Sequence, residues 1–113
     1  MYELKDEVLC IVNTGAVTDQ HRAVGTRIVQ LLPLGANVVV LEDYYHFPPG
    51  HSNLYCLDRY LRPVWSAEIP SATDAYVGPL AERDGRLNCA SWEGWFYTID
   101  AATGQTLQRT FTK

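Results

Sequence analysis

Short apolar runs alternate with turn residues along most of the chain, and apolar positions with a helical period are hard to find. Runs of this length, bounded by Gly, Pro, Asn and Asp, are typical of β-strands. The pattern therefore predicts an all-β, antiparallel fold. A first strand is predicted over 7–13, followed over 14–25 by a polar loop with at most one short helical turn.

The rest of the chain divides into two groups of four predicted strands. The first group comprises 27–32, 37–42, 53–58 and 63–69, and the second comprises 75–81, 86–92, 95–100 and 106–112. We expect Pro33 to end the strand before it, because proline has no N–H to donate to a ladder. The run from Val38 to Leu41 is apolar on both faces of its strand.

One short segment occurs twice, as Leu54–Asp58 and as Phe96–Asp100. Its two aspartates lie about 42 residues apart, a spacing typical of four-stranded propeller blades. The glycines that open the two second strands, Gly35 and Gly85, lie about 50 residues apart. The two groups are therefore repeated units, and the first carries an insertion of about eight residues at 43–52.

The segment from Trp95 to Leu107 resembles the strand–Asp-Ala-Ala-Thr-Gly–strand pattern of PQQ-like β-propeller repeats. In the first unit Asp58 and Trp65 match the pattern, whereas 59–62 lacks the glycine. Leu107-Gln108 lacks the tryptophan expected in the second unit. The resemblance covers roughly 27–113 and implies blade-like sheets, with turn roles for the aspartates and the ring of Trp65 buried between stacked sheets.

Two units are too few to close a ring, because propellers need about four to eight blades. We therefore predict two four-stranded blade-like sheets plus an N-terminal strand, arranged as an incomplete propeller-like structure, a sandwich or a barrel. The chain is predicted to be one domain over 1–113, with 1–26 preceding units at 27–70 and 71–113. No quinone or other cofactor is expected, since quinone-binding members enclose it within a closed ring.

Composition and charge narrow the class of protein. The 113 residues are 47% hydrophobic and carry a formal net charge of −4. Lys and Arg form no cluster, so no nucleic-acid partner is expected. The apolar run Val8–Val12 is too short for a membrane span, and the acidic start lacks a secretory n-region. Cys10, Cys56 and Cys89 sit in apolar runs and indicate reduced thiols in the cytoplasm.

The insertion is the leading candidate site. Its aromatic side chains and stiffening prolines favour a binding loop for another protein, and the alternative is that the rings fold back to cap the core. The residues assigned to this candidate are Asp43, Tyr44, Tyr45, His46, Phe47 and His51. A second candidate is acidic and suits a basic partner, or else it forms solvated turns. It comprises Asp74, Glu82, Asp84 and Glu93, with Glu68 nearby.

The sequence contains no strong catalytic or metal-binding motif. His46, His51, Asp43 and His21 match no established zinc spacing. The adjacent carboxylates of Glu42 and Asp43 should point to opposite faces of a strand, and we expect them to be solvated. Neither catalytic residues nor a metal are therefore predicted.

These observations favour a non-catalytic protein–protein interaction module. A concrete form, by analogy alone, is a bacterial immunity-type protein that binds and neutralises a cognate toxin. Two alternatives remain open: a self-associating structural or assembly factor acting as a homodimer, and a small ligand-binding protein or enzyme that uses the 43–51 loop as a pocket wall.

Overall fold

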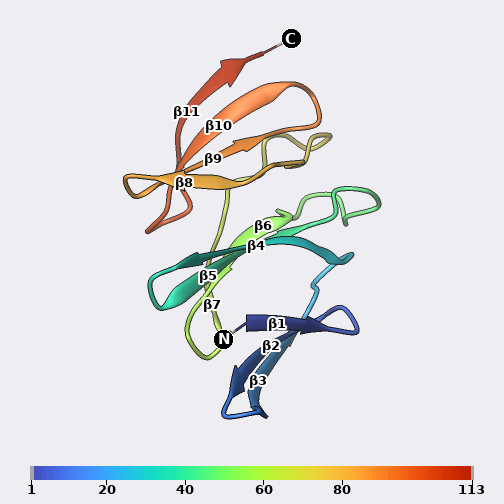
Figure 1. Cartoon of the computed structure of the whole chain (residues 1–113). Helices are drawn as coiled ribbons and strands as arrows, with labels where there is room; N and C mark the ends of the chain where they lie inside the picture. The colour runs from blue at the N-terminus through green and yellow to red at the C-terminus, as the bar shows by residue number, and fades with distance from the viewer. Residues whose placement is uncertain (1, 113) are drawn as a thin grey trace.

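Eleven antiparallel strands form three sheets in the computed structural model, which describes residues 2–112. The sheets lie face to face in chain order, so that the chain enters at one end of the stack and leaves at the other (Figure 1). The molecule measures 46 × 31 × 19 Å. The predicted all-β, antiparallel fold class is confirmed, and the arrangement is propeller-like rather than a barrel.

The N-terminal sheet contains three strands where one was predicted. They are β1 (Tyr2–Lys5), β2 (Val8–Asn13) and β3 (Ala16–Arg22). The predicted first strand is β2, but the expected polar loop over 14–25 is wrong because β3 occupies most of it. A turn at Thr14-Gly15, both with positive φ, returns the chain onto β2. Pairing with a buried neighbour, which a polar sequence does not reveal, makes β3 a strand.

The middle sheet is a four-stranded meander that is covered on both faces. Its strands are β4 (Ile28–Leu34), β5 (Asn37–Glu42), β6 (Leu54–Leu57) and β7 (Pro63–Ser66). The apolar run Val38–Leu41 lies in β5 and supplies side chains to both cores, as its pattern predicts. Pro33 does not end β4, because β4 is an edge strand and needs no N–H on its open side.

The C-terminal sheet is a second four-stranded meander. Its strands are β8 (Ala81–Arg83), β9 (Arg86–Ala90), β10 (Trp95–Asp100) and β11 (Thr106–Phe111). The predicted strand 75–81 is wrong over most of its length, since only an isolated bridge joins Tyr76 to Ser91 there. Gly78 takes a positive φ, and Pro79 lacks an N–H, so this segment cannot continue a ladder.

Two side-chain amides, from Gln30 in β4 and from Asn53 just before β6, hold this irregular segment in place of strand pairing. The Asn53 side chain donates to the carbonyl of Tyr76 at 2.7 Å and accepts the N–H of Tyr76 at 3.1 Å. The Gln30 side chain likewise donates to the carbonyl of Leu80 and accepts the N–H of Leu80, both at 2.7 Å. The backbone polar groups are thereby satisfied, which a buried segment requires.

Two hydrophobic cores lie between the three sheets. The first packs β5 and β6 against β9 and β10, and the second packs β2 against the opposite face of β5 and β6. The rows of side chains on the outer faces of the end sheets are mostly polar by register; they include Glu3, Lys5, Gln20 and Arg22 at one end and Asn88, Thr98, Gln108 and Thr110 at the other. The apolar faces are thus buried inside the stack.

One tryptophan joins the middle and C-terminal sheets. The ring of Trp65 lies flat against Gly104, where an added Cβ would come within 2.5 Å of it. Its Nε1 donates to the carbonyl of Ala101 at 3.0 Å. Trp65 is half-buried and packs on the core between these sheets, in keeping with the position that the family resemblance implies. In the first unit Leu61, with φ +61°, adopts the left-handed conformation that Gly104 adopts in the second.

Candidate functional site

The inserted loop consists of two consecutive tight turns at one end of the middle sheet. The N–H of Phe47 donates to the carbonyl of Tyr44 at 3.3 Å, and the N–H of His51 donates to the carbonyl of Pro48 at 3.4 Å. His46 takes the positive φ that such a turn requires. The loop projects on the same side of the stack as the β9–β10 turn (Figure 1). Hydrogen bonds within its own backbone therefore help to set the shape of the loop.

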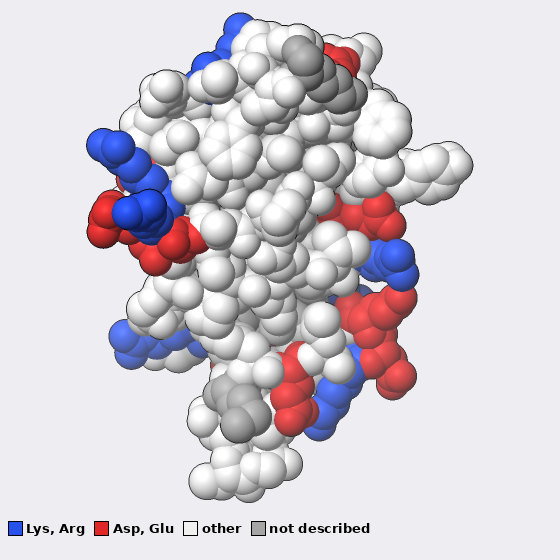
Figure 2. Space-filling model, turned by 45° about the horizontal axis from the view of Figure 1, so that its top comes forward, with Lys and Arg blue, Asp and Glu red and all other residues white. Residues whose placement is uncertain are grey.

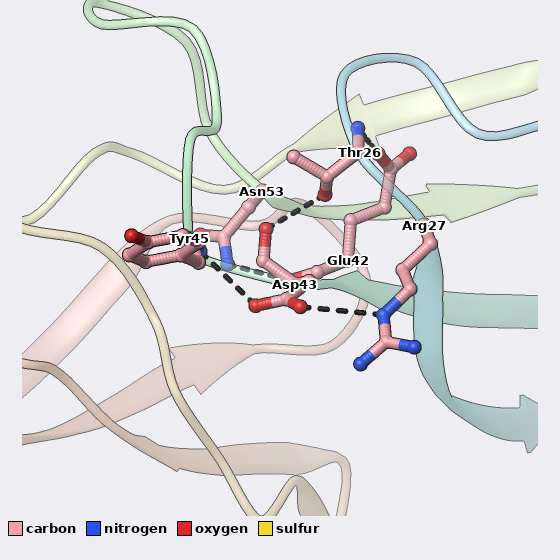
Figure 3. Close-up of polar contacts among 6 residues, drawn as sticks. All are labelled: Thr26, Arg27, Glu42, Asp43, Tyr45 and Asn53. Atoms are coloured by element: carbon pink, nitrogen blue, oxygen red, sulfur yellow. Dashed lines mark hydrogen bonds and ion pairs between the residues drawn. The ribbon is translucent and has the colours of Figure 1, made fainter.

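Asp43 fixes the base of this loop. Its carboxylate pairs with the guanidinium of Arg27 at 3.3 Å and accepts the N–H of Tyr45 at 3.0 Å (Figure 3). Its carbonyl accepts the hydroxyl of Thr26 at 2.7 Å. Asp43, predicted as a partner-binding residue, thus has its charge compensated inside the protein and acts as an anchor of the loop.

Glu42 is fully buried, contrary to the expectation that it is solvated. Its carboxylate accepts the backbone N–H groups of Val24, Gly25 and Thr26 at 2.7, 2.9 and 3.0 Å, together with the hydroxyl of Tyr55. These four donors replace the water that the charge loses on burial. A single carboxylate thereby binds three consecutive N–H groups of the segment that links the N-terminal and middle sheets.

The same network extends to a histidine. The Nε2 atom of His21 lies 2.8 Å from the Tyr55 hydroxyl oxygen. Because that hydroxyl donates its own proton to Glu42, it accepts a hydrogen bond from His21, so the Nε2 atom of His21 carries the proton. Burial lowers the pKa of His21, although the charge of Glu42 opposes it. Burial alone would raise the pKa of Glu42, but the hydrogen bonds from Thr26, Tyr55, Val24 and Gly25 outweigh it and lower that pKa.

We expect the free energy of unfolding to fall on acidification in two steps. Below the ordinary histidine pKa of 6.5 the unfolded chain takes up a proton that folded His21 refuses, so stability falls as the pH falls towards the lowered folded pKa. Glu42 also has a lowered pKa in the folded state, so the free energy of unfolding falls further as the pH drops below the ordinary glutamate pKa of 4.5. Urea titrations at several pH values measure both steps. A His21→Gln variant that keeps the full loss between about pH 6.5 and 5 would contradict the assignment.

The aromatic residues of the loop have two different fates. Phe47 folds back on the chain, and its ring lies so close to Gly25 that an added Cβ there would come within 2.8 Å of it. Tyr44 and Tyr45 instead remain exposed, at 37% and 65%. Tyr45 packs edge-on against His46. Phe47 therefore folds back as the second alternative expects, whereas Tyr44 and Tyr45 do not cap the core, and their role in binding stays a prediction.

Tyr44 stacks on Trp92, which belongs to the C-terminal sheet. The ring centroids are 5.2 Å apart and the planes differ by 24°. Trp92, in the β9–β10 turn, is 58% exposed. Sequence reasoning missed Trp92 because it placed this residue at the end of a predicted strand; its position beside the tight turn Glu93-Gly94 was the available signal.

A hollow of about 380 Å³ lies between the inserted loop and the segment joining the two units. It is lined by residues 44–51, 71–75 and Trp92, and we call it the aromatic hollow. His46 and His51 both line it. The structure therefore brings five of the six loop candidates, Tyr44, Tyr45, His46, Phe47 and His51, to one concave surface.

The four acidic candidates separate into two pairs. Asp74 lines the aromatic hollow, and its Oδ1 accepts the N–H of Glu93 at 2.9 Å. Glu93 in turn accepts the hydroxyl of Thr73 at 2.8 Å. Glu82 and Asp84 lie at the β8–β9 turn, at the opposite end of β9. Only Asp74 and Glu93 thus adjoin the loop candidates.

The sequence of the chain matches one family of protein domains. A model described as a domain of unknown function, DUF7957, matches residues 2–111. The chain belongs to this family. No curated protein matches its sequence.

Solved structures show what this DUF7957 domain is similar to in fold. The computationally designed Ika8 protein is 15% identical with a TM-score of 0.69, covering 96% of this chain and 32% of that one. BamB from Moraxella catarrhalis, a PQQ-like β-propeller protein, is 17% identical with a TM-score of 0.65, covering 98% and 32%. This chain therefore spans about a third of either structure, and the likeness shows a propeller-like fold.

Two buried cysteines lie in strands β6 and β9 of the DUF7957 domain. Burial raises the pKa of Cys56 to about 11 and that of Cys89 to about 12, so both thiols are protonated and weakly nucleophilic at neutral pH. Within residues 2–112 no three His, Cys, Asp or Glu side chains gather to hold a metal ion. No helix in that range has the length and apolar character needed to cross a membrane.

Charged side chains gather at the margins of the face in Figure 2, with both signs intermixed around a broad uncharged area. Close pairs of opposite charge among the described residues include Arg83 with Asp84 and Arg62 with Asp58. No strongly basic surface of the kind that binds nucleic acid is visible on this face.

Proposed function

We propose that this DUF7957 domain is a non-catalytic module that binds another protein through the aromatic hollow. One observation carries the proposal: Tyr44 and Trp92, from two different sheets, form an exposed stacked pair at the wall of a 380 Å³ hollow. Exposed Tyr and Trp beside a concave surface are typical of the anchoring residues of protein interfaces.

The rigidity of the loop supports the proposal. Pro48-Pro49 and the anchoring of Asp43 restrict the loop backbone before binding. A surface that is already ordered loses less conformational entropy on association, so more of the contact energy appears as affinity. Phe47, which is half-buried, packs against Gly25, while Tyr44 and Tyr45 are exposed.

The two alternatives receive different support. Self-association by stacking of end sheets is disfavoured by the largely polar outer faces of those sheets, although the aromatic hollow itself remains available to a second copy. A small-molecule ligand is favoured by the volume of the hollow, which lies in the usual range for such sites of roughly 300–1,000 Å³. The exposed stacked pair of Tyr44 and Trp92 favours a larger partner, because exposed Tyr and Trp are typical anchors of protein interfaces.

The immunity-type role and a cytoplasmic location belong to the same proposal. Buried, protonated thiols at Cys56 and Cys89 support a reducing compartment. The toxin-binding role predicts that the gene follows directly after a toxin gene and that the two products copurify. A toxin whose activity is unaffected by equimolar domain would contradict this form of the proposal.

We expect a Tyr44→Ala/Trp92→Ala double variant to lose its protein partner while keeping its fold. Truncation of two anchoring rings is expected to weaken binding by about 2–4 kcal/mol. The measurement is quantitative capture from native lysate with immobilised wild-type and variant chains, followed by titration of the enriched protein.

Tyr60→Ala is the matched control, because Tyr60 is also exposed, at 53%, but lies on the turn after β6, at the opposite end of that strand from the loop. The partner should be retained by this variant. Equal capture by the double variant and the wild type would overturn the proposal.

A further inference from the structure

We propose that the aromatic hollow receives an arginine side chain from the partner, with the guanidinium stacked on the Tyr44–Trp92 pair and attracted by the carboxylates of Asp74 and Glu93. This inference rests on the proposed function and specifies the chemistry of the partner. The aromatic hollow combines an aromatic surface, negative charge without an ion pair among the described residues and a concave shape.

The charge at the hollow is negative and uncompensated. None of the residues that line it is Lys or Arg. Asp43, beside the loop, is paired with Arg27, whereas neither Asp74 nor Glu93 takes part in an ion pair among residues 2–112. Within the same range the Oδ2 atom of Asp74 is buried and accepts no hydrogen bond. A buried carboxylate oxygen without a partner is unfavourable, and a cation brought close to it relieves that cost.

The aromatic pair suits a flat cation. An arginine guanidinium is planar, stays charged, and stacks on aromatic faces while directing its N–H groups to carboxylates. A lysine ammonium is more strongly hydrated and loses more on entering such a hollow. The ring of Trp92 is 58% exposed and therefore has surface left for a further stacking partner.

The chain already contains an arginine placed over an aromatic ring at two other positions. The guanidinium of Arg62 lies 5.0 Å from the ring centroid of Tyr60, and that of Arg109 lies 4.5 Å from the ring of Trp95. In both cases an arginine of the chain itself covers the ring. Tyr44 and Trp92 are exposed rings near the carboxylates of Asp74 and Glu93, which form no ion pair, and no arginine from residues 2–112 covers these rings.

Titration of the full-length chain with arginine amide tests the inference by NMR. We expect shifts of the Trp92 indole N–H and of the backbone amides of 73–75, with a dissociation constant on the order of 1–10 mM for so small a probe. Norleucine amide, which has an uncharged side chain, should leave these signals in place at the same concentration. Lysine amide should bind several-fold more weakly than arginine amide.

An Asp74→Asn/Glu93→Gln variant should bind arginine amide about three- to five-fold more weakly. Both substitutions keep an oxygen for the hydrogen bonds that these side chains accept: Asp74 accepts the N–H groups of Ala75 and Glu93, and Glu93 accepts the Thr73 hydroxyl. An Asp84→Asn/Glu82→Gln variant makes the same change of charge at the far turn and should bind as the wild type does.

Equal shifts with norleucine amide, equal binding of lysine amide, or unchanged affinity of the Asp74→Asn/Glu93→Gln variant would overturn the inference. Its failure is distinguishable from that of the proposed function. A protein partner that depends on Tyr44 and Trp92, together with no response to arginine amide, leaves the proposed function standing and removes the arginine. A response to arginine amide without any such partner removes the proposed function instead.

Discussion

Replacement of Glu42 by alanine is expected to lower the free energy of unfolding by about 3 kcal/mol, because it leaves one buried and three part-buried donors without their acceptor. Three of these donors are consecutive backbone N–H groups, beginning at Val24, in the segment that links the N-terminal and middle sheets. The fourth is the hydroxyl of Tyr55. Urea denaturation followed by circular dichroism measures the effect.

Glu7→Ala provides the control, since Glu7 is exposed, and the expected change there is within about 0.5 kcal/mol. Tyr55→Phe removes one donor and leaves the carboxylate with the three backbone N–H groups, so its effect should be clearly smaller than that of Glu42→Ala. A loss below about 1 kcal/mol for Glu42→Ala would show that the linking segment is held by other contacts.

Replacement of Gly104 by alanine is expected to destabilise the protein by about 2–4 kcal/mol through two separate effects. The residue has φ +78°, a conformation that alanine adopts only with strain. The new Cβ would also come within 2.5 Å of the Trp65 ring and force the middle and C-terminal sheets apart. Thermal and urea unfolding of the purified variant give the size of the loss.

A matched glycine separates the two effects. Gly15 has a similar φ of +83° but no atom within 4 Å of an added Cβ, so Gly15→Ala reports the backbone strain alone, about 1 kcal/mol. In a Trp65→Ala background the effect of Gly104→Ala should fall to that value, because the clash is gone. Equal losses for Gly104→Ala and Gly15→Ala in the wild-type chain would show that the ring moves aside without cost.

The candidate site was predictable from the sequence only where it interrupts the repeat. Alignment of the two units isolates 43–52, and the structure places five of its six candidate residues at one hollow. Trp92 and the network of His21, Tyr55 and Glu42 could not be found in this way. Each brings together side chains from different sheets, and these contacts exist only once the sheets have stacked.

The sequence by itself determined the strands whose side chains carry their own signal. The bounds of β5 and β10 match the prediction, since both strands are rich in β-branched or aromatic residues and end at turn residues. It also determined the repeat and the turns at Asp58 and Asp100, because local hydrogen bonds from the following backbone to each aspartate set those conformations.

The tertiary structure alone decided the rest. The polar segment Ala16–Arg22 is a strand because β2 offers it a ladder. Gly78 and Pro79 interrupt strand pairing over 75–80, but only the assembled fold brings Gln30 and Asn53 to its backbone groups. The pairing of β3 with β2 completes the N-terminal sheet. This sheet covers the second face of β5, which two blades without a closed ring would leave exposed. Burial of Glu42 likewise depends on donors from a distant segment, since a charge is buried only where the assembled fold supplies partners that the local sequence lacks.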